Sequence, residues 1–296
     1  YYEESLAISR EVGDRAGEGT TLNNIGQSYI NQGQYENASE FLQQALEISQ
    51  EIGSFASEGV TLNEIGRISQ NQGNYEDSLK YYKQALEVYK SIGNPAWVAV
   101  ALNNIGAVYR AQGNYSEAMR YYEESLAISH EVGDRAGEEV TLHNIAGIYR
   151  NQDQKDLALE YYEASLSIIR ELGRKASAIP TLSSIASLYR EREDYDLALT
   201  YYQEALALSR EVQLPDREGS ILSNIGSIYD DQNQDEQALK YYQQALAVSQ
   251  ALGDRSIEGF RIYLIGTVYV ELARYSEALE TLQQAFSIMK ELGEEN

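Results

Sequence analysis

Leu102-Asn103-Asn104-Ile105-Gly106 is a five-residue stretch that recurs along the chain with little change. Its counterparts follow one another every 40 residues and begin at Leu22, Leu62, Leu142, Leu182, Leu222 and Ile262. The register holds from end to end without an insertion or a deletion. A fixed period of this kind is the signature of a repeat protein, so the 296 residues are not expected to divide into ordinary globular domains.

Each repeat contains two stretches with the periodicity of an amphipathic helix. The first, which we call helix A, has small or apolar residues at positions i, i+3, i+4 and i+7, namely Leu22, Ile25, Gly26 and Tyr29. A break at Gly33 separates it from a second stripe in residues 38–52, which predicts helix B. Small residues such as Gly26 and Ala45 allow the two helices to approach closely.

Glycine recurs where helix B ends, because a left-handed residue closes a helix there at least cost. These glycines are Gly13, Gly53, Gly93, Gly133, Gly173 and Gly253. Other residues replace glycine at some turns, namely Asp153, Glu193, Gln213, Asn233 and Ala273. Pro180 falls within a predicted helix A, so we expect that helix to start late or to kink. Repeats four to six are therefore expected to be the least regular.

One hairpin cannot cover its own apolar face, so the repeats must stack, and the sequence predicts an all-α, right-handed superhelical solenoid. We assign residues 1–296 to a single array in which one unpaired helix B, residues 1–13, precedes seven helix pairs. The pairs span residues 14–53, 54–93, 94–133, 134–173, 174–213, 214–253 and 254–293. Because the first helix B lacks its helix A, we expect Leu6 and Ile8 to be partly exposed and the chain to associate end to end.

These residues resemble the tetratricopeptide repeat family, whose pattern has Leu, Gly or Ala and Tyr on helix A and Ala and aromatic residues on helix B. The resemblance covers the whole chain. The 40-residue spacing and the Leu-Asn-Asn-Ile-Gly segment are similar to the longer repeats of kinesin light chains, spindle-orientation adaptors and bacterial signalling proteins. The family implies that helix A lines a concave groove in which a peptide or protein segment is held.

Composition excludes several classes of partner. Lys and Arg total 23 against 46 Asp and Glu, a net charge of -23, which repels nucleic acid and anionic membranes. Cysteine is absent, so there are no disulfides and no thiolate sites, which fits a cytoplasmic protein. We therefore expect a protein or peptide partner, with no nucleic acid and no membrane.

Nothing in the sequence predicts catalysis or a cofactor. His130 and His143 are the only histidines, and neither has a helical partner at i+3 or i+4 that would complete a metal pair. No phosphate-binding glycine loop occurs. We expect no enzymatic activity, no metal and no cofactor in this segment.

Adjacent tyrosines recur on helix B. They are Tyr81-Tyr82, Tyr121-Tyr122, Tyr161-Tyr162, Tyr201-Tyr202 and Tyr241-Tyr242. Adjacent helical residues point about 100° apart. We expect one tyrosine of each pair in the core and the other in packing between repeats.

The residues that flank the buried stripe of helix A are the candidates for ligand contact, given the groove that the family implies. They are Asn23, Asn24, Gln27, Asn63, Arg67, Asn103, Asn104, Arg110, His143, Asn144, Arg150, Arg190, Asn224, Phe260, Tyr263 and Leu264. The predicted groove is polar and rich in amides early, basic in the middle, acidic late and apolar at its end.

Paired asparagines such as Asn103-Asn104 are poor helix formers, and each costs a few tenths of a kcal/mol, roughly, relative to alanine. An amide offers a donor and an acceptor together, which match the acceptor and donor of a peptide unit. A ladder of asparagines can therefore hold an extended backbone of any sequence. In the alternative, one asparagine of each pair bonds between neighbouring helices.

Four arginines, Arg67, Arg110, Arg150 and Arg190, recur on helix A of an acidic chain. A basic stripe of this kind favours an acidic or phosphorylated ligand, with an apolar anchor at Phe260, Tyr263 and Leu264. In the alternative, each arginine pairs with an acidic residue of its own or the next repeat, such as Glu64, Glu191 or Asp194.

The sequence thus favours a protein-interaction scaffold that binds a peptide in its groove and belongs to a larger adaptor or signalling protein. Two alternatives stay open. The array is a structural or self-assembling spacer, or it is the regulatory segment of an enzyme whose catalytic domain lies elsewhere.

Overall fold

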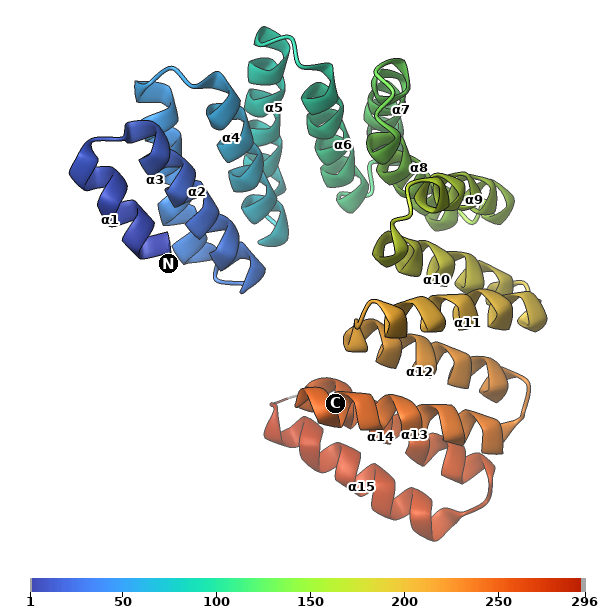
Figure 1. Ribbon diagram of the computed structural model, residues 1–296. Coiled ribbons are helices and arrows are strands. Elements are labelled where there is room, and N and C mark those ends of the chain that lie inside the picture. The colour runs from blue at the N-terminus through green and yellow to red at the C-terminus, as the bar shows by residue number, and fades with distance from the viewer. Residues whose placement is uncertain (1, 294–296) are drawn as a thin grey trace. The chain divides into compact units, whose positions relative to one another are not determined.

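The computed structural model describes residues 2–293, and all regular structure in that range is α-helical (Figure 1). The helices are α1 (Tyr2–Val12), α2 (Arg15–Asn31), α3 (Tyr35–Glu51), α4 (Phe55–Asn71), α5 (Tyr75–Ser91), α6 (Pro95–Ala111), α7 (Tyr115–Glu131), α8 (Arg135–Asn151), α9 (Lys155–Glu171), α10 (Lys175–Glu191), α11 (Tyr195–Glu211), α12 (Pro215–Asp231), α13 (Asp235–Leu252), α14 (Arg255–Glu271) and α15 (Tyr275–Glu291). Even-numbered helices are A helices and odd-numbered helices are B helices. The expected all-α repeat solenoid is confirmed.

A left-handed residue follows every helix. The backbone angle φ is positive at every twentieth residue from Gly13 to Gly293. At Gly113, for example, φ is 74°, its N–H donates to the Arg110 carbonyl, and the N–H of Asn114 donates to the Tyr109 carbonyl. These bonds satisfy carbonyls that the helix end leaves free. Each turn is therefore equally short, and each helix starts at the same offset.

Five of these positions lack glycine and still keep the left-handed backbone. They are Asp153, Glu193, Gln213, Asn233 and Ala273, with φ between 55° and 61°. A Cβ in this conformation crowds the following carbonyl oxygen, at a cost of roughly 1–2 kcal/mol. The substitutions noted in the sequence leave the turns unchanged in shape, and they store strain there.

Several helices have a side-chain cap at their first turn. A side-chain oxygen accepts a hydrogen bond from the third backbone N–H of the helix at Asp14, Asn94, Asn114, Asp134, Asp194 and Asp254. Such caps contribute about 1 kcal/mol each.

The late start expected near Pro180 is wrong, because α10 begins at Lys175 in register with the other A helices. The turn at the preceding left-handed residue sets the start, and proline costs one internal hydrogen bond without moving it. The irregularity expected for repeats four to six is also not seen in helix length. Helices α8 to α12 have 17 residues each and α13 has 18.

A glycine of helix A meets an aromatic ring of helix B within each of several hairpins. A Cβ added to Gly106 would lie 2.7 Å from a ring carbon of Tyr122. Gly66 with Tyr82 and Gly226 with Tyr242 repeat this contact. The inner tyrosine of each pair is buried, and the outer one, such as Tyr121, stacks on an A-helix tyrosine with ring centroids 5.5 Å apart. The core position of one tyrosine of each pair is confirmed, but the rings on which Tyr121, Tyr201 and Tyr241 stack belong to helix A of the same repeat and not to a neighbouring repeat.

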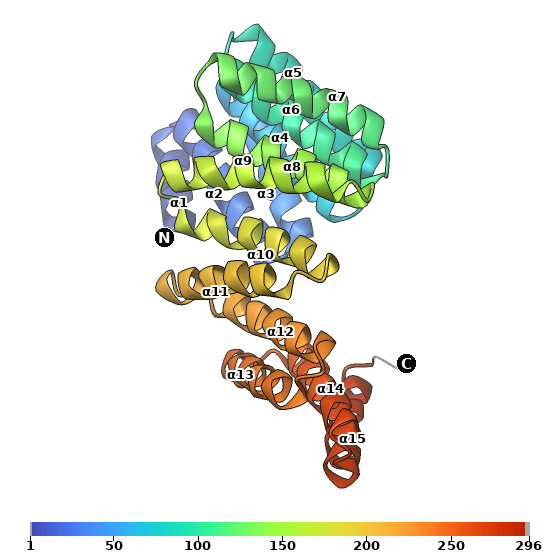
Figure 2. The same ribbon diagram turned by 90° about the vertical axis from the view of Figure 1, so that its right-hand side faces the viewer.

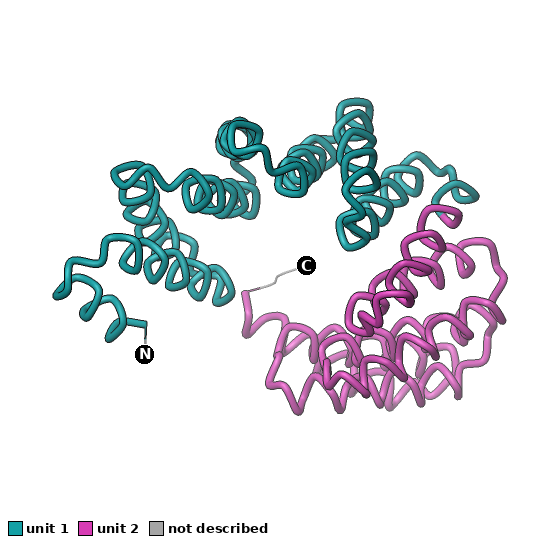
Figure 3. Tube along the Cα trace, turned by 45° about the horizontal axis from the view of Figure 1, so that its top comes forward, with its two compact units in different colours: residues 1–158 teal, residues 159–296 magenta. Residues whose placement is uncertain are grey.

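The chain forms two compact units, residues 1–158 and residues 159–296 (Figure 3). In the first unit, α2 packs against α4 and α6 packs against α8, in addition to the contacts between consecutive helices. In the second unit, α10, α11 and α12 lie next to one another in chain order (Figures 1 and 2). Within residues 2–293 no helix is both long and apolar enough to cross a bilayer.

The first helix corrects one expectation. Leu6 is buried, at 8% exposure, in a cluster with Leu22 and Ile25 of α2. It faces the helix A that follows α1, whereas Ile8 is 55% exposed, as expected.

Replacement of a strained turn residue by glycine should stabilise the protein. We expect Glu193→Gly and Ala273→Gly each to raise the free energy of unfolding by about 0.5–1 kcal/mol, since relief of left-handed strain exceeds the entropy that glycine adds to the unfolded chain. Gly113→Ala, the matched reverse change, should lower it by a similar amount. Urea unfolding measures all three, and a loss of stability in both glycine variants would contradict this account.

Candidate functional site

The polar side chains of the A helices form the candidate site, which we call the A face and describe separately in each unit. In unit 1 the A face is formed by α2, α4, α6 and α8. The two asparagine rungs on it are hydrogen bonds between successive A helices. Asn104 Nδ2 donates to Asn63 Oδ1 at 2.8 Å, and Asn144 Nδ2 donates to Asn103 Oδ1 at 3.0 Å. These contacts match the alternative interpretation of the sequence, in which one asparagine of each pair bonds between neighbouring helices.

Asn103 is buried, and both polar atoms of its amide are already hydrogen-bonded. It is only 8% exposed, and its Nδ2 donates to Thr141 Oγ1 at 2.7 Å while its Oδ1 accepts from Asn144. Its amide thus bonds to side chains of α8 through both polar atoms.

The other asparagines of the rungs keep free hydrogen-bonding capacity. Asn63, Asn104 and Asn144 are partly exposed, and each makes one side-chain hydrogen bond. Within residues 2–293 no protein group bonds to Asn63 Nδ2, Asn104 Oδ1 or Asn144 Oδ1. The face therefore presents one amide NH2 group and two amide oxygens that have no protein partner, from adjacent helices.

The first repeat contributes less to this arrangement. Asn24 is exposed, and Asn23 only accepts a long 3.5 Å bond from Thr61 Oγ1. Gln27 accepts from Arg67 and donates to Asn31. Gln27 is thus already occupied by its neighbours.

Two of the four arginines are tied to neighbouring side chains. Arg67 bonds to Glu64 at 2.6 Å and to Gln27 at 2.8 Å. Arg190 of unit 2 binds Asp231 through two nitrogens, at 2.5 and 3.0 Å. Arg67 therefore pairs with Glu64, as the alternative interpretation of the sequence predicted. Arg190 also pairs with an acidic residue, but with Asp231, which that interpretation did not name. Arg150 also has interaction partners in the structure.

Arg110 differs from the other three. It is partly exposed, but its Nε atom is buried and has no hydrogen-bond partner in residues 2–293. It forms no ion pair within that range. Its charge acts on two neighbours, the Tyr122 hydroxyl of α7 and the His143 imidazole of α8. Burial, followed by the Arg110 charge, lowers the pKa of His143, which therefore stays neutral near pH 7.

The sequence did not predict Tyr122 as a site residue, because its position in the apolar stripe of helix B indicates a core residue. Its ring is fully buried, yet its hydroxyl has no hydrogen-bond partner in residues 2–293. A comparison of equivalent positions in successive repeats could have identified it. Tyr82, one repeat earlier, donates to Gln70, and Arg110 occupies the position of Gln70.

The A face of unit 2, on α10, α12 and α14, has a different chemistry. Burial and then nearby carboxylates, above all Asp231, raise the pKa of Asp230. Phe260 and Tyr263 are 52% and 45% exposed, whereas the adjacent Leu264 packs partly against the Tyr242 cluster. Asn224 is partly exposed. Two of the three predicted apolar anchors are therefore available at the surface.

A small hollow of about 210 Å³ opens beside Asn23, between α2, α3 and α4. Small and aliphatic residues line it, including Gly19, Ile48 and Val60, and Trp97 of α6 forms its edge. Its size and lining suit one apolar side chain.

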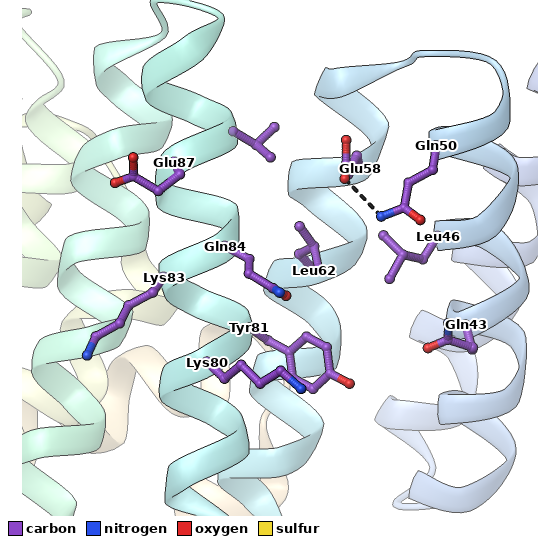
Figure 4. A pocket seen from close by; sticks show the side chains of 11 residues that line it. Gln43, Leu46, Gln50, Glu58, Leu62, Lys80, Tyr81, Lys83, Gln84 and Glu87 are labelled. Atoms are coloured by element: carbon purple, nitrogen blue, oxygen red, sulfur yellow. Dashed lines mark hydrogen bonds between the residues drawn. The ribbon is translucent and has the colours of Figure 1, made fainter.

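A larger cleft of about 570 Å³ lies between the B helices α3 and α5, over α4 (Figure 4). Leu46 and Leu62 lie on its floor, and the Gln50–Glu58 hydrogen bond of 3.0 Å lies at one end. Lys83 and Glu87 point to the opposite side of α5 from Leu62 (Figure 4). The charges therefore do not converge on one point in this cleft.

The residues described here offer no metal site. No cluster of three or more His, Cys, Asp or Glu side chains with ligand geometry occurs within residues 2–293. His130 instead bonds to Glu138 at 3.0 Å.

Solved structures share this fold at low sequence identity. The apo quorum sensor NprR from B. thuringiensis is 16% identical, with coverage of 97% of this chain and 81% of its own and a TM-score of 0.74. The Rap conjugation gene regulator of plasmid pLS20, solved with the Phr* peptide, is 14% identical, with coverage of 96% and 77% and a TM-score of 0.66. BtubC from P. vanneervenii is 19% identical, with coverage of 76% and 91% and a TM-score of 0.66.

No curated protein sequence matches the chain. The tetratricopeptide repeat family model matches residues 1–51, 57–131, 137–211, 177–251 and 217–291. These matches cover nearly the whole sequence, in the register of the observed helix pairs. The chain therefore belongs to the tetratricopeptide repeat family.

Proposed function

We propose that this protein is an interaction scaffold whose A face in unit 1 binds an extended peptide segment of a partner protein. The observation that carries the proposal is the pair of asparagine rungs, Asn63–Asn104 and Asn103–Asn144. In each rung one hydrogen bond joins the two amides, and Asn63 Nδ2, Asn104 Oδ1 and Asn144 Oδ1 have no protein partner within residues 2–293.

Such rungs suit a peptide backbone. A peptide unit presents one N–H and one C=O; Asn104 Oδ1 can accept from the N–H, and Asn63 Nδ2 can donate to the C=O. The rung bonds restrain the side chains before a ligand arrives, so less conformational entropy is lost on binding. Recognition of this kind reads the backbone and tolerates many sequences.

The solved neighbours support a peptide as the ligand, since one of them is a complex with the Phr* peptide and another is a quorum sensor. The hollow beside Asn23 supplies a place for one apolar side chain of the segment. In this proposal the scaffold acts by binding, and it performs no chemistry on its partner.

Removal of the exposed rung should weaken binding. A fluorescein-labelled dodecapeptide enriched from a random phage library on the wild-type protein serves as the probe. For Asn63→Ala with Asn104→Ala we expect about tenfold weaker binding, because several hydrogen bonds to the backbone are lost. One inter-helix hydrogen bond is lost as well, which costs about 1 kcal/mol of stability.

Asn37→Ala, which removes an exposed amide on α3, is the matched control and should bind like the wild type. Fluorescence of Trp97, the single tryptophan, reports whether the hollow fills. Equal affinity of the wild type and the double variant in anisotropy titrations would contradict the proposal.

A second function, self-assembly, is favoured by the outer face of α15. Tyr275, Leu279 and Phe286 are each at least 60% exposed, along one stripe of the helix. Contiguous exposed apolar residues mark association surfaces. In this proposal copies of the chain associate through α15 and through the exposed Ile8 face of α1.

We therefore expect concentration-dependent association, which Leu279→Lys with Phe286→Lys should abolish. Light scattering from micromolar to millimolar concentration measures it. Leu197→Lys, which alters an exposed leucine on α11, is the control and should leave the association intact. A wild-type monomer throughout this range would contradict self-assembly and leave the peptide proposal untouched.

A further inference from the structure

The inner tyrosine hydroxyls provide an internal comparison between repeats. Tyr82 Oη donates to Gln70 Oε1 at 3.1 Å, and Tyr242 Oη bonds to Ser227 Oγ at 3.0 Å. At the same two positions of its own repeat, Tyr122 meets Arg110 and Ala107. Neither side chain has an acceptor, so the sequence change explains why the Tyr122 hydroxyl donates its hydrogen to no side chain.

Both groups at this point are hydrogen-bond donors. Burial raises the pKa of Tyr122 to about 12, although the Arg110 charge opposes the rise, so the phenol keeps its proton at neutral pH. Arginine has five N–H donors and no acceptor. The phenol oxygen can accept from the Arg110 guanidinium of the adjacent helix, but the phenol hydrogen has no acceptor on either α6 or α7.

The local charge is positive in a chain whose net charge is -23. Carboxylates neutralise Arg67 and Arg190 but not Arg110. The charges that act on Tyr242 are those of Asp230, Arg190 and Asp231, whereas the charge that acts on Tyr122 is that of Arg110 alone. An unpaired cation next to a buried unsatisfied hydroxyl is a costly arrangement unless a ligand completes it.

We propose that Arg110 and Tyr122 form an anion-binding site on the A face that receives a carboxylate or phosphate oxygen of an acidic peptide. This proposal rests on the proposed function, because the peptide backbone would lie on the neighbouring rungs. One anionic oxygen accepts from the guanidinium and, as the Arg110 side chain adjusts, from the Tyr122 hydroxyl. Asn104, on the same helix as Arg110, holds the adjoining peptide unit.

The unpaired hydroxyl itself is testable by stability. Tyr82→Phe should lower the free energy of unfolding, because it deletes the bond to Gln70. Tyr122→Phe should leave it unchanged or raise it, because it removes an unsatisfied buried group. Urea unfolding of both variants measures the difference. An equal loss in the two variants would show that Tyr122 has a partner in the free protein and would overturn the site.

Acetate, the simplest carboxylate, tests the site without a peptide. In a 15N-labelled sample we expect the Nε–H signal of Arg110 to shift saturably with acetate and not with chloride at equal ionic strength. Arg110→Gln is the main variant because it recreates the Gln70–Tyr82 pair and should fold normally, and it should abolish the acetate-dependent shifts of the backbone amides around residue 110. Arg190→Gln is the control and should leave the Arg110 shift intact. No saturable shift in the wild type would overturn the proposal.

Three peptides test the ligand class. They are fluorescein-labelled copies of the library-selected dodecapeptide with Glu, phosphoserine or Gln at the position that contacts Arg110, found by scanning each position. We expect about tenfold preference for an anionic residue over Gln in the wild type, and less than twofold in Arg110→Gln. A preference that persists in Arg110→Gln would overturn the site. Loss of all three affinities in the rung variant with acetate binding retained would separate the two proposals.

Discussion

The left-handed residue at every twentieth position is the constraint on which the rest of the structure depends. It ends one helix and fixes the start of the next, so the separation in sequence between contacting residues is the same in every repeat. Residue n of helix A meets residue n+16 of helix B, as Gly106 meets Tyr122 and Gly66 meets Tyr82. A one-residue change in any turn would rotate the next helix by about 100° and bring a different face inward.

The same constraint fixes which charged side chains of neighbouring helices meet. The end of a B helix reaches the next A helix at a separation of eight, as in Arg10–Glu18, His130–Glu138 and Arg210–Glu218. Glu18 and Glu138 are buried, and the hydrogen bonds from Arg10 lower the pKa of Glu18 against the effect of burial. Part of the acidic excess thus serves to join the repeats. The remaining exposed carboxylates keep the surface negative, which makes an unpaired arginine conspicuous.

The period of the sequence was enough to predict the helices, their order and the inner tyrosines, because these depend on local patterns that repeat seven times. The partners of polar side chains were harder to predict. Asn103 and Asn104 both flank the apolar stripe, and only the rotation between neighbouring helices decides that Asn103 is buried against Thr141 while Asn104 is partly exposed. The late start predicted at Pro180 was wrong because the local signal was given too much weight. The fixed turn before α10 outweighs one residue of poor helix propensity.

Repetition also makes a departure readable in physical terms. The same backbone environment occurs several times along the chain. A tyrosine whose hydroxyl lacks a hydrogen-bond partner, Tyr122, can therefore be compared with Tyr82 and Tyr242, whose hydroxyls have one. A duplicated array could have kept glutamine at residue 110, with the hydroxyl paired and the stability that this gives. Arginine there leaves the Nε–H of Arg110 unpartnered and the phenol hydrogen of Tyr122 without an acceptor in a region of low dielectric, where such groups are most costly. Local rules that are broken without compensation inside the fold are expected where the missing partner is a ligand.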